Sequence, residues 1–168
     1  MKKVLFIILF LISTQVNAEI VKKIDIEGNE RISDETIKVY GDISLNKNLS
    51  QADTNLILKK LYETDFFETV NVTLSNGVLK VMLKEYDTIH TIEVQGEKRS
   101  SIRKELLERI SLKEKGSFIK SKLKDDVQLI KELYASQGFN FLEVDTKIET
   151  FSSNRLNLLI ILNKGKKT

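Results

Sequence analysis

The chain contains the same module twice, and this internal repeat restricts its fold more than any other feature of the sequence. Residues 24–28 (IDIEG) return as residues 92–96 (IEVQG). Four further matches follow in the same order: Arg31 with Arg99, 43–45 (ISL) with 110–112, 61–62 (LY) with 133–134, and Phe67 with Phe139. Chance similarity does not produce five ordered matches, so we predict two copies of one structural unit.

Hydrophobic periodicity gives the order of elements in the first copy. Ile20, Ile24 and Ile26 alternate with charged neighbours, which predicts a half-buried strand. A short helix is expected between Ser33 and Gly41, and the capping-box pattern over residues 50–53 starts a second helix. Asn76-Gly77 separates two alternating runs, which predicts a β-hairpin. The predicted order is β-α-α-β-β.

The second copy repeats this order, with helices around Leu106 and Ile130 and a hairpin that turns at residues 152–154. The predicted fold class is therefore α+β. It consists of two tandem βααββ modules, each a three-stranded mixed sheet with two helices packed on one face.

Two details of the second copy depart from simple alternation. The spacing from Phe141 to Val144 is odd for one face of a strand and predicts a bulge. Leu159 and Ile161 make the last strand apolar on both faces, which is typical of a central strand covered on each side.

The first 18 residues predict export. Met1-Lys2-Lys3 is basic, residues 4–12 are apolar, and Val16-Asn17-Ala18 supplies small residues for cleavage between Ala18 and Glu19. The apolar run is about half of the roughly 20 residues that a membrane span requires. We therefore expect a signal peptide rather than an anchor.

Composition excludes several classes of chemistry. The chain has 27 basic and 24 acidic residues, so it lacks the strongly basic character of a dedicated nucleic-acid binder. It has no cysteine, and therefore no disulfide, thiolate metal site or lipidated cysteine. Its one histidine, His90, has no second histidine for a catalytic or metal site, and Asp125-Asp126 lies on a predicted helix surface among lysines. We expect no enzyme activity, no catalytic, cofactor-binding or metal-binding residues, and no cofactor.

Four segments carry a resemblance to a known family. Residues 20–29 resemble the opening of a first POTRA domain, and residues 61–72 its second helix running into its hairpin. Residues 83–96 resemble the passage from the first to the second POTRA domain of BamA-type outer-membrane protein assembly factors, and residues 154–165 the end of the second. The resemblance implies a signal peptide over 1–18, POTRA-like domains over 19–87 and 88–165, and the start of a continuation at 166–168.

The resemblance also implies a function. POTRA domains of this family lie on the periplasmic side of the bacterial outer membrane and handle nascent outer-membrane proteins during barrel assembly. The implied partners are unfolded outer-membrane proteins and assembly lipoproteins or periplasmic chaperones, with no nucleic acid. The family pattern continues into further modules and a membrane barrel, so we expect this chain to be an N-terminal fragment that would contact the membrane only through that missing barrel.

The implied binding mode is β-augmentation, in which an extended segment adds to an open sheet edge. The hairpin strands 69–75 and 143–150 are the expected edges. Their outward residues are Thr69, Asn71, Thr73, Glu143, Asp145 and Lys147. Polar outward residues are also what any solvated sheet face carries. The pair Phe66-Phe67 is expected in the core rather than in a docking patch.

Two other functions remain open from the sequence. The same module occurs in two-partner secretion transporters and TamA-like translocation factors. A KH-type nucleic-acid module also has a β-α-α-β core, but it needs a GxxG loop between its helices, and residues 41–50 and 111–121 contain none.

Overall fold

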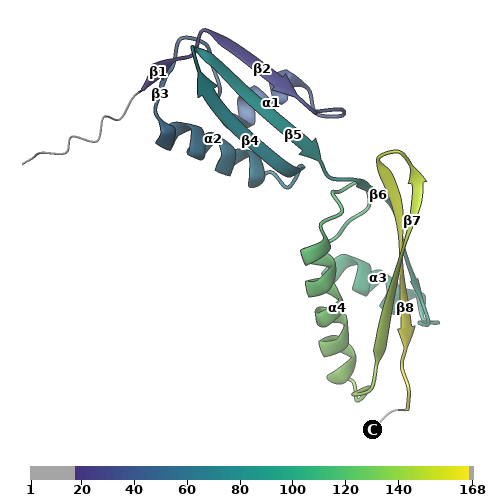
Figure 1. The fold of residues 1–168 in the computed structure, drawn as a ribbon. Coiled ribbons are helices and arrows are strands. Elements are labelled where there is room, and N and C mark those ends of the chain that lie inside the picture. The colour runs from purple at the N-terminus through teal and green to yellow at the C-terminus, as the bar shows by residue number, and fades with distance from the viewer. Residues whose placement is uncertain (1–17, 167–168) are drawn as a thin grey trace, which may run out of the picture.

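The computed structural model describes residues 18–166, which form two three-stranded sheets, each accompanied by two helices (Figure 1). The predicted signal peptide lies outside the described residues, except for the exposed Ala18.

The first half contains β1 to β5 with α1 and α2. Their bounds are β1 Glu19–Ile20, β2 Lys23–Glu27, α1 Asp34–Gly41, β3 Asn48–Leu49, α2 Gln51–Tyr62, β4 Phe67–Ser75 and β5 Val78–Glu85. The sheet has the order β2-β5-β4, with β2 parallel and β4 antiparallel to the central strand β5. The two short strands β1 and β3 pair with each other, which the sequence pattern did not predict; placing Ile20 in the first strand of the sheet is wrong, because it lies in β1.

The second half has the same topology without the short strand pair. Its elements are β6 Thr88–Gln95, α3 Ser100–Arg109, α4 Lys120–Ala135, β7 Glu143–Ser152 and β8 Arg155–Asn163. The sheet order is β6-β8-β7, with β6 parallel and β7 antiparallel to the central strand β8. The predicted bulge between Phe141 and Val144 is wrong, because Phe141 precedes the strand and the shift in register lies between Thr150 and Ser152.

Local sequence signals start the elements where the sequence predicts. Ser33 Oγ accepts a hydrogen bond from Thr36 N at the start of α1. Ser50 and Asp53 form the predicted capping box at the start of α2, an arrangement that stabilises a helix by about 1 kcal/mol. Asn76-Gly77 turns the β4–β5 hairpin with positive φ at both residues, 54° and 78°, as a two-residue hairpin turn requires.

The repeated glycine has a structural reason that is the same in both halves. Gly28 and Gly96 follow the parallel edge strands with φ of 90° and 86°. A Cβ atom on either residue would overlap a backbone carbonyl oxygen of the central strand, that of Leu83 or Leu162. The glycine at the same position of each copy therefore allows the end of β2 to lie close against β5, and the end of β6 to lie close against β8.

Two separate hydrophobic cores lie beneath the sheets. The first contains Leu61, Phe67 and Leu79, and the second contains Ile130, Tyr134 and Leu158. The expectation that Phe66-Phe67 belongs to the core is confirmed, because Phe67 is buried and Phe66 packs partly buried against the same cluster.

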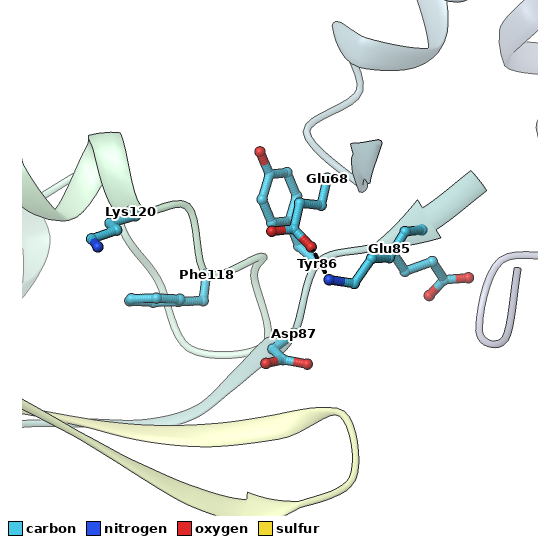
Figure 2. A pocket seen from close by; sticks show the side chains of 7 residues that line it. Glu68, Glu85, Tyr86, Asp87, Phe118 and Lys120 are labelled. Carbon is cyan, nitrogen blue, oxygen red and sulfur yellow. Dashed lines mark ion pairs between the residues drawn. The ribbon is translucent and has the colours of Figure 1, made fainter. Parts of the chain in front are cut away.

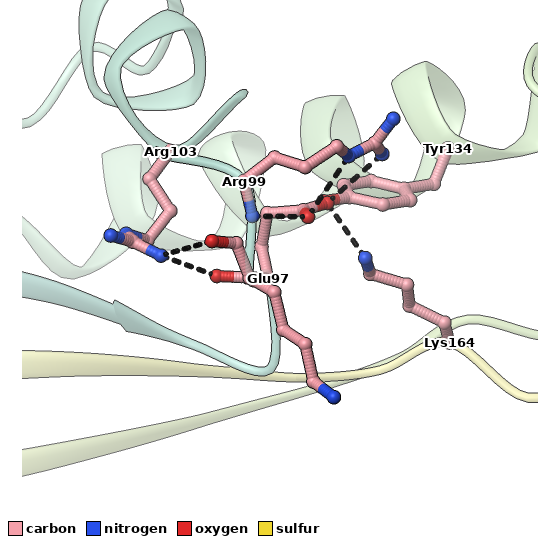
Figure 3. Close-up of polar contacts among 6 residues, drawn as sticks. Glu97, Arg99, Arg103, Tyr134 and Lys164 are labelled. Carbon is pink, nitrogen blue, oxygen red and sulfur yellow. Dashed lines mark hydrogen bonds and ion pairs between the residues drawn. The ribbon is translucent and has the colours of Figure 1, made fainter. Parts of the chain in front are cut away.

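A buried carboxylate joins the ends of the parallel strands in the second half (Figure 3). Glu97, which follows Gly96, is only 4% exposed. It accepts hydrogen bonds from the Tyr134 hydroxyl at 2.7 Å and from Lys164 Nζ at 2.7 Å, and pairs with Arg99 at 3.2 Å. The hydrogen bonds from Arg99, Lys164 and Tyr134 outweigh burial and hold the pKa of Glu97 well below its usual value.

The first half uses a carboxylate from the opposite strand for the same purpose. Glu85, at the end of the central strand β5, accepts backbone hydrogen bonds from Glu30, Arg31 and Ile32 at 2.8–2.9 Å. Arg31 Nε also pairs with Glu85 at 2.9 Å. Burial acts to raise the pKa of Glu85, but these donors and Arg31 lower it overall. The repeated arginine thus meets a buried glutamate in both halves, from β5 in one and from the β6–α3 loop in the other.

Replacing the glycine after β6 tests the close approach of the two strands. We expect Gly96→Ala to lower the free energy of unfolding by about 2 kcal/mol or more, because it combines a positive φ with a clash against backbone. Gly116→Ala is the comparison, since Gly116 has no positive φ and a Cβ there would approach Lys113 O to 3.1 Å, against 1.9 Å from Leu162 O at Gly96, so a smaller loss is expected. Urea denaturation of both variants measures the difference; equal losses would contradict this role for Gly96.

The pKa of Glu97 predicts a defined pH dependence. Because the folded state lowers this pKa from the usual 4.5, the stabilisation is complete above that value and is lost as the pH falls below it. We expect Glu97→Gln to cost about 2–3 kcal/mol near pH 7 and to flatten the loss of stability below about pH 5. Exposed Glu108→Gln is the control, and denaturation at several pH values is the measurement. An unchanged slope in Glu97→Gln would contradict the assignment.

Candidate functional site

The two strands expected to bind peptide are both sheet edges. Within residues 18–166, β4 has β5 as its only sheet neighbour and β7 has β8 as its only one. Each strand therefore presents a row of backbone N–H and C=O groups without a strand partner. The opposite edges, formed by β2 and β6, also lack a second neighbour in this part of the chain.

Edge strand β4 is exposed on one face only. Thr69, Asn71 and Thr73 are exposed and point away from the core, as expected, whereas Val70 and Val72 are buried beneath the sheet. A register shift between Phe67 and Thr69 interrupts the pairing at the start of the strand. A peptide adding to β4 would therefore meet mainly its backbone.

Edge strand β7 is accessible on both faces over most of its length. Glu143, Asp145 and Lys147 are exposed, as expected for outward residues. Ile148 lies opposite Leu158, on the core-facing side, yet it is 51% exposed. Thr146 and Thr150 on that side are also exposed. The strand thus extends beyond the cover of its helices and offers an apolar side chain beside a free edge.

The far end of β7 is held by an aromatic stack. The rings of Phe151 and His90 stack with centroids 3.8 Å apart, and the Arg155 guanidinium lies 5.2 Å from the Phe151 ring centroid. Both rings lie at register shifts, in β7 and in β6. The single histidine, for which the sequence suggested no particular role, is half-buried and packs one sheet edge onto the other.

The exposure of Ile148 is the feature of the site that sequence reasoning missed. A partial signal exists, because the core-facing positions of β7 alternate Val144, Thr146, Ile148 and Thr150. Threonine at two of four such positions is unusual beneath a complete helix layer. The sequence of β7 alone, however, does not show how far α3 and α4 extend over the sheet.

A hollow of about 290 Å³ lies where the two halves meet (Figure 2). Only Tyr86 and Asp87 connect β5 to β6. The hollow is lined by Glu68, Lys84, Glu85, Tyr86, Asp87, Phe118 and Lys120. The Glu68–Lys84 ion pair, at 2.5 Å, crosses one side, and Phe118 N donates to Asp87 O at 2.7 Å across the junction. The hydrogen bond between Phe118 and Asp87 joins the loop before α4 to the connection between the halves.

Two further observations concern the described part of the chain. Among residues 18–166, no three acidic or histidine side chains lie close enough together to hold a metal ion. No helix in this range has the length and hydrophobicity to cross a membrane.

Comparison with known proteins finds a family model that matches the second half of the chain and solved structures of similar fold. Residues 88–165 match the family model POTRA, described as a surface antigen variable number repeat. The chain therefore carries, in its second half, a segment that matches POTRA. Its fold resembles the N-terminal domain of Omp85 from Thermosynechococcus elongatus, with a TM-score of 0.55, 12% identity, and coverage of 85% of this chain and 62% of that one.

Two curated proteins are similar to most of this chain. The chain is 26% identical over 148 residues to the outer membrane protein assembly factor BamA of Neisseria meningitidis, covering 87% of this chain. It is 23% identical over 163 residues to BamA of Neorickettsia risticii, covering 95% of this chain. The chain spans 19% and 22% of these relatives, about a fifth of their length. The similarity to both proteins extends over most of this chain.

Hydrogen exchange tests whether the β7 edge is free in solution. We expect slow exchange along the central strand β8 and an alternation of slow and fast amides along β7, because one side of an edge strand has no partner. The buried strand β5 is the internal control for a fully paired strand. Uniform slow exchange along β7, measured by NMR, would mean that another strand already covers this edge.

Proposed function

We propose that the chain is the periplasmic POTRA region of an outer-membrane protein assembly factor, with one POTRA module in each half. The shared topology, the repeated glycine and the repeated arginine support a second module over residues 19–87 beside the one matched at 88–165. The BamA relatives support the assembly function. In this proposal the chain acts by binding, not by catalysis, after export by its N-terminal signal.

The exposed edge strand β7 carries the proposed mechanism. It has ten residues, one sheet neighbour and little cover on either face. An extended segment can add to it through backbone hydrogen bonds, which do not depend on the sequence of the segment. This tolerance suits a protein that must handle many different outer-membrane proteins.

Side-chain contacts at β7 favour one kind of segment. Strands of membrane barrels alternate apolar and polar residues. A segment added to β7 would place its apolar face beside Ile148 and the half-buried Val144. Its polar face would lie beside Glu143, Asp145 and Lys147. Unfolded outer-membrane proteins are therefore the proposed substrates, while assembly lipoproteins or periplasmic chaperones could use the same edge or the shorter exposed face of β4.

Translocation proteins, including two-partner secretion transporters and TamA-like factors, share this type of module. The names of the BamA relatives favour assembly over translocation.

A peptide titration tests strand addition. The probe is an unfolded ten-residue segment with alternating apolar and polar residues, added to the isotope-labelled chain from Glu19 onward and followed by NMR. We expect shifts along β7 that change little with salt. The same peptide with alternate backbone amides methylated should not bind, because it keeps its side chains but loses its donors. Shifts confined to the helices would overturn the mechanism.

A substitution tests the role of the exposed isoleucine. We expect Ile148→Lys to weaken the peptide about fivefold, because roughly 1 kcal/mol of apolar burial is lost at a half-exposed position. Val39→Lys is the control, since Val39 is 77% exposed on α1, far from any predicted edge. Equal weakening by both variants would show that charge rather than contact at β7 governs binding.

A further inference from the structure

The two sheets differ on the face that no helix covers. In the first sheet the central strand presents Lys80, Met82 and Lys84 to this face. In the second sheet it presents Leu159 and Ile161 between Asn157 and Asn163. The sequence predicted cover on both faces of β8, and among the described residues only the opposite face has helices packed on it. We call the helix-free side of the second sheet its open face.

Charges on the two helix-free sides are arranged differently. In the first sheet Glu27 pairs with Lys80 at 3.0 Å and Glu68 with Lys84 at 2.5 Å. The register of the second sheet places four carboxylates around Leu159 and Ile161. They are Glu93 on β6 and Glu143, Asp145 and Glu149 on β7. Within the described residues none of the four is in an ion pair; the one cation on this face of β7 is Lys147, which lies opposite Leu159 between Asp145 and Glu149.

A small hollow marks the open face. It has a volume of about 80 Å³ and is lined by Thr91, Glu93, Glu149, Asn157, Leu158 and Leu159. A hydrogen bond of 2.9 Å between Thr91 Oγ1 and Asn157 Oδ1 joins β6 to β8 here. Glu93 and Glu149 come from the two strands that flank β8, so their carboxylates stand on opposite sides of the hollow. The charge of a cationic side chain entering the hollow would be neutralised by Glu93 on one side and Glu149 on the other.

We propose that the open face of the second sheet binds a cationic amphipathic helix of a partner protein. Three strands spaced about 4.8 Å apart place β6 and β7 roughly 10 Å from each other, which matches the diameter of a helix. The apolar side of such a helix covers Leu159 and Ile161. Its flanking lysines or arginines reach Glu93 on one side and Asp145 or Glu149 on the other, with one of them in the hollow.

The charge of the face decides between possible occupants. Four carboxylates against the single lysine Lys147 leave this face negative, so it repels anionic lipid headgroups and attracts a basic helix. The open face borders the β7 edge and shares Glu143 and Asp145 with it, but a helix would rest on side chains there whereas an added strand pairs with the β7 backbone. The inference is therefore independent of strand addition.

The test uses a probe that cannot extend into a strand. A helical peptide of leucine and lysine, stabilised with α-aminoisobutyric acid, is titrated into the chain from Glu19 onward by NMR and calorimetry at low and moderate salt. We expect shifts at Thr91, Glu93 and Leu159, with affinity that falls as salt increases. The matching leucine–glutamate helix should not bind. Shifts confined to other surfaces would overturn the proposal.

Charge reversal supplies the matched comparison. The double variant with Glu93→Lys and Glu149→Lys should bind the probe at least about tenfold more weakly. Glu35→Lys with Glu108→Lys makes the same change in net charge on exposed helix positions and should bind as the unmodified chain does. Equal losses in both pairs would show non-specific attraction and overturn the site.

Two further readouts keep the proposal falsifiable. Leu159→Lys, which gives the second sheet a lysine like those of the first, should also abolish binding while circular dichroism shows an intact fold. If sedimentation shows that the unmodified chain is a dimer and that the Glu93→Lys and Glu149→Lys variant is a monomer, the face is occupied by a second copy. That result would overturn the assignment to a partner helix.

Discussion

The close contact between a glycine and a carbonyl oxygen of the central strand fixes the architecture of each half. Gly28 against Leu83, and Gly96 against Leu162, allow the N-terminal strand to lie parallel to the central strand with no side chain between them. Once that side of the central strand is occupied, its hairpin partner must take the other side. The strands β4 and β7 therefore lie on the side of the central strand away from the glycines, where no further strand pairs with them within residues 18–166.

The buried glutamates show that the two copies form a similar interaction with residues from different positions. In both halves a carboxylate and an arginine close the end of the parallel pair, but Glu85 belongs to the central strand and Glu97 follows the edge strand. The second half adds Lys164 and the hydroxyl of Tyr134 to the same carboxylate. Burying either glutamate carboxylate without its hydrogen-bond donors would be costly, so each glutamate and its donors depend on one another.

Local signals in the sequence were sufficient for most of the fold. The cap at Ser50 and the Asn76-Gly77 turn each depend on a few neighbouring residues, and both are found where they were predicted. The error at Phe141 arose because a spacing was interpreted as a bulge within a strand that begins only at Glu143. The β1–β3 pair was missed because two-residue strands carry no periodicity.

The candidate sites were less predictable because they depend on which helices and side chains cover a strand. Thr69 and Asp145 could be assigned to outward positions from alternation alone. The exposure of Ile148 depends on how far α4 extends across the sheet, and the unpaired carboxylates depend on which lysines reach them. Both are long-range properties, and neither repeats between the two halves.

The connection through Tyr86 and Asp87 has a mechanical consequence. It joins the central strand of one half directly to an edge strand of the next, so a pull along the chain loads β5 at its C-terminal end and β2 at its N-terminal end. These strands are parallel, and the two ends being pulled lie at opposite ends of the pair. Such a load stretches all the hydrogen bonds between β2 and β5 together instead of opening them one at a time. Each half is therefore built to resist tension along the direction in which successive modules are joined.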